Sequence, residues 1–399
     1  MTYSRMGLFL LVIAFIAFIS LGLPDGLLGV AWPSMHQSLD APLNALGVLV
    51  IGVTAGYVMS TVLSGKLVAL LGIGKLLAIS CALTATALIS YTIVPIWWMA
   101  MLTGIMAGLG GGAIDAALNN YISHNHRALL FLLHAMFGIG TTAGPLIMNT
   151  ALNTTTWRSG YWVVGGFQIL LALTFLLTAH LWDKNAILTD DDATSKKAVP
   201  PARLRDTAKM PVVWFGVAFF LLYTGTEASV GQWSYTLFTQ TRNTDLNTAA
   251  FFIGAYWGAF TFGRVVSGLI VRVISEHLFM RLSMIGLVVG ELIMLININD
   301  TLSLLALPLV GFSVAPMFPS MVGSTQDRLP PQHVANAIGF QIGAAGLGGG
   351  VIVGLGSLIS GVFGLEAIFI SNLMFAIAIF VLYELIHAQT FRNAKLATG

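Results

Sequence analysis

Two acidic residues that lie inside long apolar segments are the first candidates for chemistry in this chain. Asp25 follows a proline within the apolar stretch that begins at Met6, and Asp115 lies in the glycine-rich stretch 110–120. A charge at the centre of a bilayer costs roughly 2.5 kcal/mol or more, so an acid persists there mainly in a cavity or a pair. A carboxylate in a cavity can take up a proton near neutral pH. Asp25 and Asp115 are therefore predicted to be proton-coupling residues, which take up and release a proton.

Polar and aromatic side chains near these acids, or at matching places in the chain, predict a binding site. Asn119 follows Asp115 by four residues, so the two share one helix face. Amides and carboxylates hold hydroxyl groups, aromatic faces stack on sugar rings, and histidine relays protons near neutral pH. The predicted substrate-binding residues are Asn119, Glu227, Gln232, Trp233, Gln341 and His134.

Each of these residues also has a purely structural interpretation. Asp25 could bond backbone groups that Pro24 leaves free, and Glu227 could clamp two helices together. Trp233 lies near the end of its segment, where tryptophan commonly anchors a helix at the membrane interface. His134 could be a packing residue. Glu291 is assigned a structural role.

Composition places the chain in a membrane. The sequence is 57% hydrophobic and only 9% charged, whereas soluble domains are about 25% charged. The net charge of +2 predicts no nucleic-acid partner, and the single cysteine, Cys81, allows no disulfide within the chain. No metal-ligand cluster, phosphate-binding loop or nucleophile triad is found, and the GLGGG at 346–350 lies in an apolar segment. The sequence therefore predicts no metal, no cofactor and no enzymatic activity.

Twelve apolar segments are each long enough to span a bilayer, which takes about 20 residues. All the basic residues except Arg158 and Arg242 fall on the cytoplasmic side if both termini are cytoplasmic. The predicted spans are 7–34, 43–71, 75–94, 97–122, 128–152, 159–181, 211–238, 248–272, 279–297, 301–325, 333–360 and 365–387.

A polar stretch divides the chain into two halves. Residues 183–210 carry acidic, basic and proline residues and predict a cytoplasmic linker between bundles at 1–182 and 211–399. The halves repeat, because LPDGLLGVAWP at 23–33 matches GTEASVGQWS at 225–234, which pairs Asp25 with Glu227. Residues 51–66 also match 253–269. A six-plus-six repeat is the architecture of transporters that bind substrate between their halves.

Three patches resemble the fucose-permease-like branch of the major facilitator superfamily, which carries sugar/proton symporters. They are LPD at 23–25, GGGAIDAALNN at 110–120 and YTGTEASVGQW at 223–233. The resemblance implies an all-α fold of twelve helices in two pseudo-symmetric six-helix bundles, and acids near the middle of the first and fourth helices. Asp115 stands where the fucose carriers place glutamate, which changes the reach of the side chain.

Two segments resemble degenerate copies of a loop motif of the same superfamily. The first copy contains Gly65 and Lys66, and the second contains Arg264, Gly268 and Arg272. The resemblance implies a conformational role, in which charges and helix ends latch one state. The first copy lacks the aspartate of the motif.

The sequence therefore predicts a secondary transporter of the bacterial inner membrane that takes up a monosaccharide with protons by alternating access. The expected partners are a small-molecule substrate, the coupling proton and membrane lipid, and the expected assembly is a monomer. Sodium-coupled sugar transport and proton-coupled efflux of drugs or small molecules are the alternatives within transport. An intramembrane enzyme or a receptor is the alternative outside it.

Overall fold

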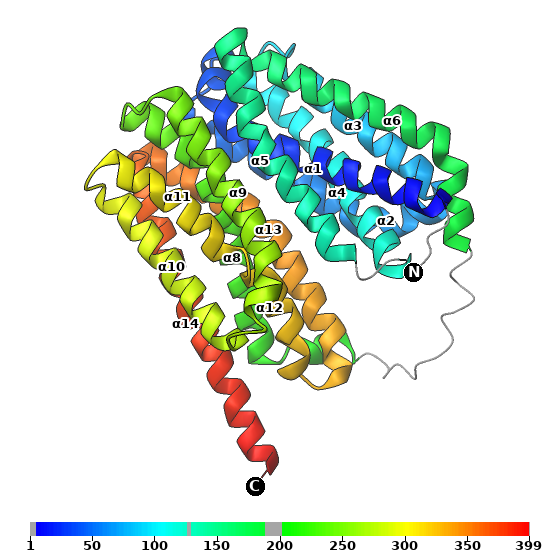
Figure 1. Ribbon diagram of the computed structural model, residues 1–399, viewed down its shortest axis with the longest axis vertical. Coiled ribbons are helices and arrows are strands. Elements are labelled where there is room, and N and C mark those ends of the chain that lie inside the picture. Colours follow the sequence, from blue (N-terminus) through cyan, green and yellow to red (C-terminus); the bar gives the residue numbers. More distant parts are fainter. Residues whose placement is uncertain (1–4, 126–128, 188–201, 399) are drawn as a thin grey trace.

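The computed structural model describes residues 5–125, 129–187 and 202–398. These residues are almost entirely helical, and the described ranges contain no β-strand. Figure 1 shows two bundles of long helices that meet at one end and diverge toward the other. The predicted all-α fold is confirmed.

The N-terminal bundle contains six long helices, of 19 residues or more, so each approaches or exceeds the length needed to cross a bilayer. They are α1 (Arg5–Ser38), α2 (Leu46–Leu71), α3 (Ile73–Tyr91), α4 (Trp97–Asn125), α5 (Leu130–Thr154) and α6 (Trp157–Ile187).

The C-terminal bundle repeats this plan with one interruption. Its helices are α8 (Pro211–Thr236), α9 (Leu246–Ile270), α10 (Glu276–Ile296), α11 (Asp300–Val314), α12 (Met317–Gly323), α13 (Pro331–Phe363) and α14 (Glu366–Thr398). The tenth predicted span is thus two helices, α11 and α12, separated at Ala315 and Pro316. Proline has no backbone N–H and clashes with the preceding turn, so a helix ends readily there.

The boundary between the bundles differs from the sequence prediction. Helix α6 continues to Ile187, five residues beyond the predicted boundary at 182, and a short helix, α7 (Leu204–Thr207), forms within the predicted linker. Residues 188–201 of that linker lie outside the described ranges. The exact bounds of the two bundles and the cytoplasmic location of the linker stay predictions.

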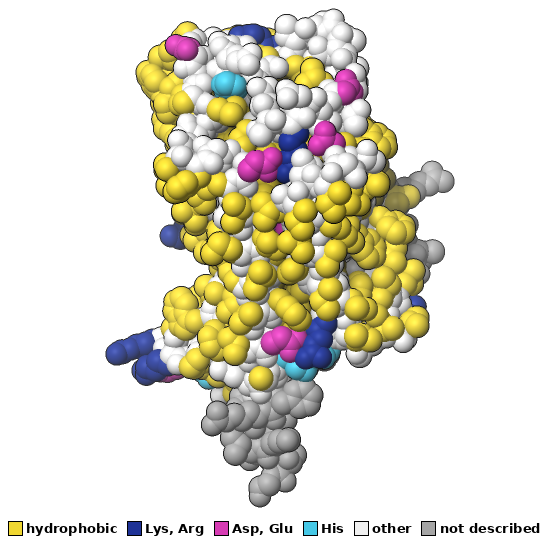
Figure 2. All heavy atoms as spheres, turned by 90° about the vertical axis from the view of Figure 1, so that its left-hand side faces the viewer, with side chains coloured by type: hydrophobic (Ala, Val, Ile, Leu, Met, Phe, Trp, Pro, Cys, Tyr) yellow, Lys and Arg dark blue, Asp and Glu magenta, His cyan; other side chains and the backbone are white. Residues whose placement is uncertain are grey.

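The surface of the molecule suits a lipid environment. Eleven of the described helices are long and apolar enough to cross a membrane, and α5 occupies the remaining position between α1 and α9. In Figure 2 a broad hydrophobic band covers the middle of the molecule, while charged side chains gather above and below it. Such a band would be unfavourable in water and is favourable in a bilayer.

The packing partners of the helices reproduce the repeat seen in the sequence. Within the N-terminal bundle α1 packs on α5, α2 on α4 and α3 on α6, and the equivalent pairs of the other bundle are α8 with α13, α9 with α11 and α10 with α14. The two bundles meet through α2 with α13 and α5 with α9, which are again equivalent pairs. The predicted pseudo-symmetry of the two bundles is therefore confirmed.

Glycines allow the closest helix pairs to form. A side chain at Gly56 of α2 would collide with the carbonyl of Ile105, and one at Gly108 of α4 would collide with the carbonyl of Val53. Small residues that let backbones approach are the usual means of helix association in membranes, where the hydrophobic effect does not drive it.

The bundles are in close contact at the end where α1 ends and α2 begins, called the closed end below. There the amide of Gly47 donates to Ser357 Oγ (2.8 Å), and the amides of Asn149 and Asn153 donate to Asn247 Oδ1 (3.0 and 2.6 Å). At the opposite end, nothing lies within 4 Å of where a side chain would start at Gly65, Gly268 or Gly339 of the three helices α2, α9 and α13.

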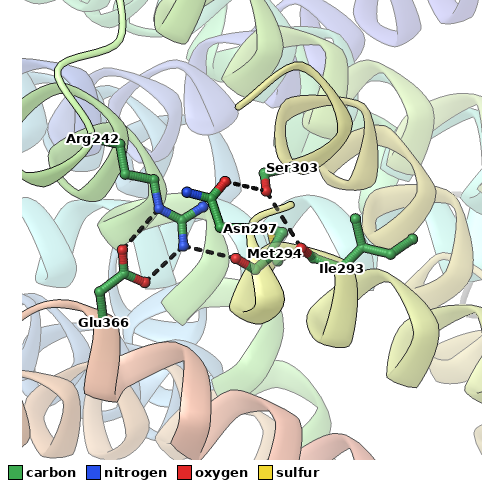
Figure 3. Close-up of polar contacts among 6 residues, drawn as sticks. All are labelled: Arg242, Ile293, Met294, Asn297, Ser303 and Glu366. Carbon is green, nitrogen blue, oxygen red and sulfur yellow. Dashed lines mark hydrogen bonds and ion pairs between the residues drawn. The ribbon is translucent and has the colours of Figure 1, made fainter. Parts of the chain in front are cut away.

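An arginine fastens three segments of the C-terminal bundle at the closed end (Figure 3). Arg242 Nε and Nη2 donate to the two carboxylate oxygens of Glu366 (2.8 and 2.7 Å), and Nη2 also donates to the carbonyl of Met294 (2.7 Å). Asn297 ends α10 in the left-handed conformation, and its Oδ1 accepts a hydrogen bond from Ser303 (2.7 Å). We call the Arg242, Glu366 and Met294 contacts the arginine clamp.

The two basic residues that the predicted topology leaves outside the cytoplasm are both held locally. Arg242 belongs to the arginine clamp. Arg158 Nε donates to the carbonyl of Thr92 (3.0 Å), and its guanidinium lies 4.6 Å from the ring centre of Trp157. These structural contacts account for the position of both arginines outside the cytoplasm, so the predicted topology is unchanged.

Candidate substrate-binding site

Asp25 lies near the middle of α1 and faces the space between the bundles. Its side chain is exposed, although the residues that follow it in α1 are buried. Its carbonyl accepts a hydrogen bond from Gln232 Nε2 of α8 (3.1 Å), and its carboxylate is within electrostatic range of Glu227. An exposed acid in mid-helix, beside the opposite bundle, is consistent with a carboxylate that faces an internal aqueous space rather than lipid.

Pro24 does not require Asp25 for a structural purpose. A proline in a helix leaves the carbonyl four residues earlier without its usual donor. That carbonyl belongs to Ser20, and the amide of Gln168 in α6 donates to it (3.3 Å). The backbone group released by the proline is therefore satisfied from elsewhere, which weakens the structural interpretation of Asp25.

Asp115 is held by two donors from two helices. Tyr57 Oη of α2 donates to Asp115 Oδ2 (2.5 Å), and Asn119 Nδ2 donates to Asp115 Oδ1 (2.8 Å) and to its carbonyl (3.0 Å). The bond from Asn119 is the direct result of their four-residue spacing on α4. The charge of Asp25 also reaches Tyr57, so both acids of the N-terminal bundle belong to one site.

The C-terminal bundle contributes an acid, a base and two tyrosines. Glu227 of α8 is within electrostatic range of Arg264 of α9, and the Tyr223 hydroxyl lies near both. Tyr256 Oη donates to the carbonyl of Glu227 (2.8 Å), and the Arg264 guanidinium lies 4.1 Å from the ring centre of Phe260. Arg264 thus supplies the positive charge of the site.

On the C-terminal side of the site, several buried polar atoms have no hydrogen-bond partner among the described residues. They are Tyr223 Oη, Glu227 Oε2, Gln232 Oε1, Trp257 Nε1 and Arg264 Nε. Leaving a buried polar group unpaired costs about 1–3 kcal/mol, so groups of this kind usually bond water or a ligand. The set contains both donors and acceptors, which suits a ligand with several hydroxyl groups.

His134 of α5 extends the site toward the N-terminal bundle. Its half-buried ring meets Phe18 edge-on at 5.9 Å, and it lies within electrostatic range of Arg264. The structure therefore brings together Asp25, Asp115, Asn119, Glu227, Gln232, His134 and Arg264.

Two predicted binding residues make contacts within the C-terminal bundle, and their role in binding stays a prediction. Trp233 is fully buried, and its indole N–H donates to the carbonyl of Val353 in α13 (3.4 Å). Gln341 is buried as well and accepts a hydrogen bond from Thr325 (3.1 Å) while packing against Gly216. Both side chains join helices of the C-terminal bundle in this arrangement.

The remaining residues of the predicted loop motif lie at the end of the molecule opposite the closed end. Lys66 and Arg272 are exposed, and Gly65 and Gly268 have open space around them. Arg264 differs, because it lies six residues before the end of α9 and interacts with the site. A conformational role for these residues stays a prediction.

The sequence prediction missed Tyr57, Tyr223, Tyr256 and Trp257. Signals for them existed, because Tyr223 precedes Glu227 by four residues and shares its helix face. Tyr57, Tyr256 and Trp257 lie within the repeated segments 51–66 and 253–269.

The fold and the site define a membrane carrier with two halves around a polar centre. The chain matches the family model of the Major Facilitator Superfamily over residues 10–296, and it belongs to that family. The superfamily predicted from the sequence is confirmed, and the chain is a carrier rather than an enzyme.

The curated relatives share little sequence identity with this chain, but the similarity extends over most of its length. The chain is similar to the glucose/mannose transporter GlcP of Bacillus subtilis (strain 168), with 21% identity over 337 residues that cover 81% of each protein. It is also similar to the sodium-dependent glucose transporter 1 of Xenopus laevis, with 24% identity over 327 residues, which are 73% of this chain and 64% of the relative.

Solved structures share the fold at low sequence identity. A D-xylose-proton symporter superposes with a TM-score of 0.74 and 13% identity, covering 93% of this chain and 96% of the other. The nucleoside transporter NupG superposes with a TM-score of 0.76 and 12% identity, covering 94% of this chain and 99% of the other.

Proposed function

We propose that this protein takes up a monosaccharide together with protons by alternating access. The observation that carries the proposal is the convergence of Asp25, Asp115 and Glu227, from both bundles, on one polar site inside an apolar protein. The names of the relatives support it, because two are glucose transporters and one structural neighbour is a sugar/proton symporter.

The sugar would bind mainly to the buried polar atoms without partners. Arg264, Trp257 and Tyr223 offer donors to sugar oxygens, while Glu227 and Gln232 offer acceptors to sugar hydroxyls. Asn119 lies on the opposite wall beside Asp115. His134 is close enough to contribute from α5, whereas Trp233 and Gln341 would act by packing.

Proton coupling would follow from the hydrogen bonds at Asp115. The ionised carboxylate accepts from both Tyr57 and Asn119. A protonated carboxyl is itself a donor, so the hydrogen bond at the oxygen that takes the proton would reverse its direction or break. Because Tyr57 belongs to α2 and Asn119 to α4, proton binding would change contacts between two helices that line the site. Asp25, in α1, is the second candidate for this role.

Alternating access would use the two ends of the bundles. The contacts among Asn149, Asn153 and Asn247 hold the closed end, while the opposite end has open space. With both termini in the cytoplasm of a bacterial cell, the closed end is extracellular and the site opens inward. We propose that the protein works as a monomer in the inner membrane.

Transport into proteoliposomes tests this function. Asp115→Asn should abolish sugar accumulation driven by an imposed pH gradient while sparing counterflow, which needs binding but no coupling. Asp25→Asn should do so instead if Asp25 carries the proton. Asp300→Asn, an exposed acid in the first turn of α11, is the matched control and should behave as wild type.

Two outcomes would contradict the proposal. Accumulation by both variants at the wild-type level, with a pH gradient and without sodium, would exclude proton coupling by either acid. Accumulation by the wild type only with a sodium gradient would favour sodium coupling. A thermal-shift screen of purified protein against hexoses and amphipathic drugs separates uptake of sugars from efflux, because a ligand that binds the folded state stabilises it.

A further inference from the structure

The C-terminal bundle contains a second group of buried polar side chains, and one of them, Glu291, lies within electrostatic range of Tyr256. Glu291 of α10, Asn372 of α14, and Thr226 and Ser229 of α8 are all completely buried. Every side-chain oxygen and nitrogen of these four residues lacks a hydrogen-bond partner among the described residues. The carrier function proposed above uses none of them.

Glu291 and Asn372 lie at the same level of two antiparallel helices. Near one end of this pair His277 contacts Tyr383 (3.0 Å) and Arg281 bonds Glu384 (2.6 Å). Glu291 lies 14 residues after His277, so it is level with the residue 14 before Tyr383, which is residue 369. Glu291 also lies 10 residues after Arg281, and the residue 10 before Glu384 is residue 374. Glu291 is therefore level with a residue between 369 and 374. Asn372 falls in that range, and it shares a helix face with Tyr383, because 11 residues make close to three full turns.

Helix α8 brings its hydroxyl groups to the same level. A side chain at Gly356 would touch both Trp233 of α8 and Ile368 of α14, so these two residues are level. Ser229 precedes Trp233 by four residues and Asn372 follows Ile368 by four, and the helices run antiparallel, so Ser229 and Asn372 are level too. Thr226 is three residues before Ser229 on the same face.

Thr226 and Ser229 lack a hydrogen bond that another hydroxyl of the same helix makes. Thr224 donates to the carbonyl of Phe220, four residues earlier (2.8 Å), whereas the buried hydroxyls of Thr226, Ser229, Ser234 and Thr236 have no partner among the described residues. Such a bond is the usual solution for a hydroxyl in a membrane helix. Thr226 and Ser229 do not make it. Their oxygens remain available to a ligand at the level of Asn372.

These groups form a set of hard oxygen donors with a single negative charge. A carboxylate buried without a counter-charge costs several kcal/mol in a protein interior, so it is neutralised either by a proton or by a bound cation. Oxygen ligands from carboxylate, amide and hydroxyl groups suit hard cations, and one carboxylate balances a charge of +1 rather than +2. We propose that Glu291, Asn372, Ser229 and Thr226 form a sodium site within the C-terminal bundle, separate from the site between the bundles.

Thermal unfolding of the purified full-length protein at pH 8 tests this proposal. At equal ionic strength, sodium chloride should raise the unfolding midpoint above its value in potassium or choline chloride, and the rise should saturate with concentration. Glu291→Gln should remove this sodium-dependent rise. Glu384→Gln, which lies on the exposed side of the same helix pair, should retain it.

Further variants keep the proposal falsifiable if Glu291→Gln does not fold. Ser229→Ala and Thr226→Val leave the carboxylate in place and should raise the half-saturating sodium concentration several-fold. Asp25→Asn combined with Asp115→Asn should retain the sodium response, so failure of the carrier proposal is distinguished from failure of this one.

Three results would overturn the proposal. An equal midpoint in sodium, potassium and choline at pH 8 would show that no sodium binds. A midpoint that follows pH alone would assign a proton to Glu291. A sodium response that survives Glu291→Gln, or that disappears with the Asp25 and Asp115 substitutions, would place sodium elsewhere.

Discussion

The arginine clamp is expected to be one of the strongest polar contributions to the stability of the C-terminal bundle. Arg242 is 4% exposed, and its guanidinium bonds both oxygens of Glu366 and the carbonyl of Met294. Glu366→Gln keeps the shape of the partner but removes its charge. The substitution leaves the Arg242 guanidinium buried without compensation, which is the unfavourable state for any ion pair.

The expected loss follows from burial on the two sides of the pair. Breaking a fully buried ion pair by removing one partner costs about 3–5 kcal/mol. Glu366 is 42% exposed, so solvent screens part of the interaction and the expected loss is about 2–3 kcal/mol. Arg242→Met combined with Glu366→Leu removes both charges, and it should recover part of that loss.

The chain contains a matched control for this prediction. Arg281 and Glu384 make the same two-pronged contact, both bonds at 2.6 Å, but their side chains are 44% and 34% exposed. Glu384→Gln should therefore cost only about 0.2–1 kcal/mol, and high salt should reduce the difference from wild type. Both pairs have the two-pronged contact, so burial and the additional bond from Arg242 to the Met294 carbonyl are what distinguish them.

Reversible unfolding in mixed detergent micelles, followed by tryptophan fluorescence, measures both free energies. The reasoning is refuted if Glu366→Gln destabilises the protein no more than Glu384→Gln does. It is also refuted if the charge-free double variant is less stable than Glu366→Gln alone, because the cost would then come from lost packing rather than from an uncompensated charge.

Two further predictions concern contacts within and between the bundles. Asn247→Ala removes both amide bonds at the closed end, which are worth about 1 kcal/mol together at an exposed site. In a Cys81→Ala background, this change should raise the rate at which a thiol reagent labels a Ser357→Cys reporter about five-fold. An unchanged rate would show that these bonds do not hold this end closed. Gly56→Val should destabilise the protein by about 1–3 kcal/mol through overpacking. At Gly166 no atom lies within 4 Å of where a side chain would start, so the melting temperature of Gly166→Val should equal that of wild type within error. Equal destabilisation by the two substitutions would contradict the packing argument.

Apolar length and short-range spacing were enough to predict much of this structure. Span positions follow from runs of about 20 apolar residues, because a backbone in lipid must satisfy its own hydrogen bonds as a helix. The bond between Asp115 and Asn119 follows from four-residue spacing. The pairing of Asp25 with Glu227 follows from the repeat.

Contacts that depend on the rotation and register of distant helices could not be predicted. Trp233 follows Glu227 by six residues, which turns it to another face of α8, toward α13. Arg264 was assigned to a loop motif because of its neighbours in sequence, yet α9 carries it to Glu227. Tyr57 meets Asp115 only because the glycines of α2 and α4 allow their backbones to approach.

The two halves of the site differ in how their charges are compensated, and this difference fits a division of labour between them. Glu227 has a counter-charge in Arg264 within its own bundle, so it can hold sugar hydroxyls as a fixed group while the proton load changes. Asp115 has only neutral donors, Tyr57 and Asn119, in its hydrogen-bond shell, and Asp25 faces the space between the bundles. Neutral donors such as Tyr57 and Asn119 can rearrange when the carboxylate takes up a proton, whereas a neighbouring arginine would oppose protonation of the carboxylate. We therefore propose that proton coupling belongs to the N-terminal side of the site and recognition of the substrate to the C-terminal side.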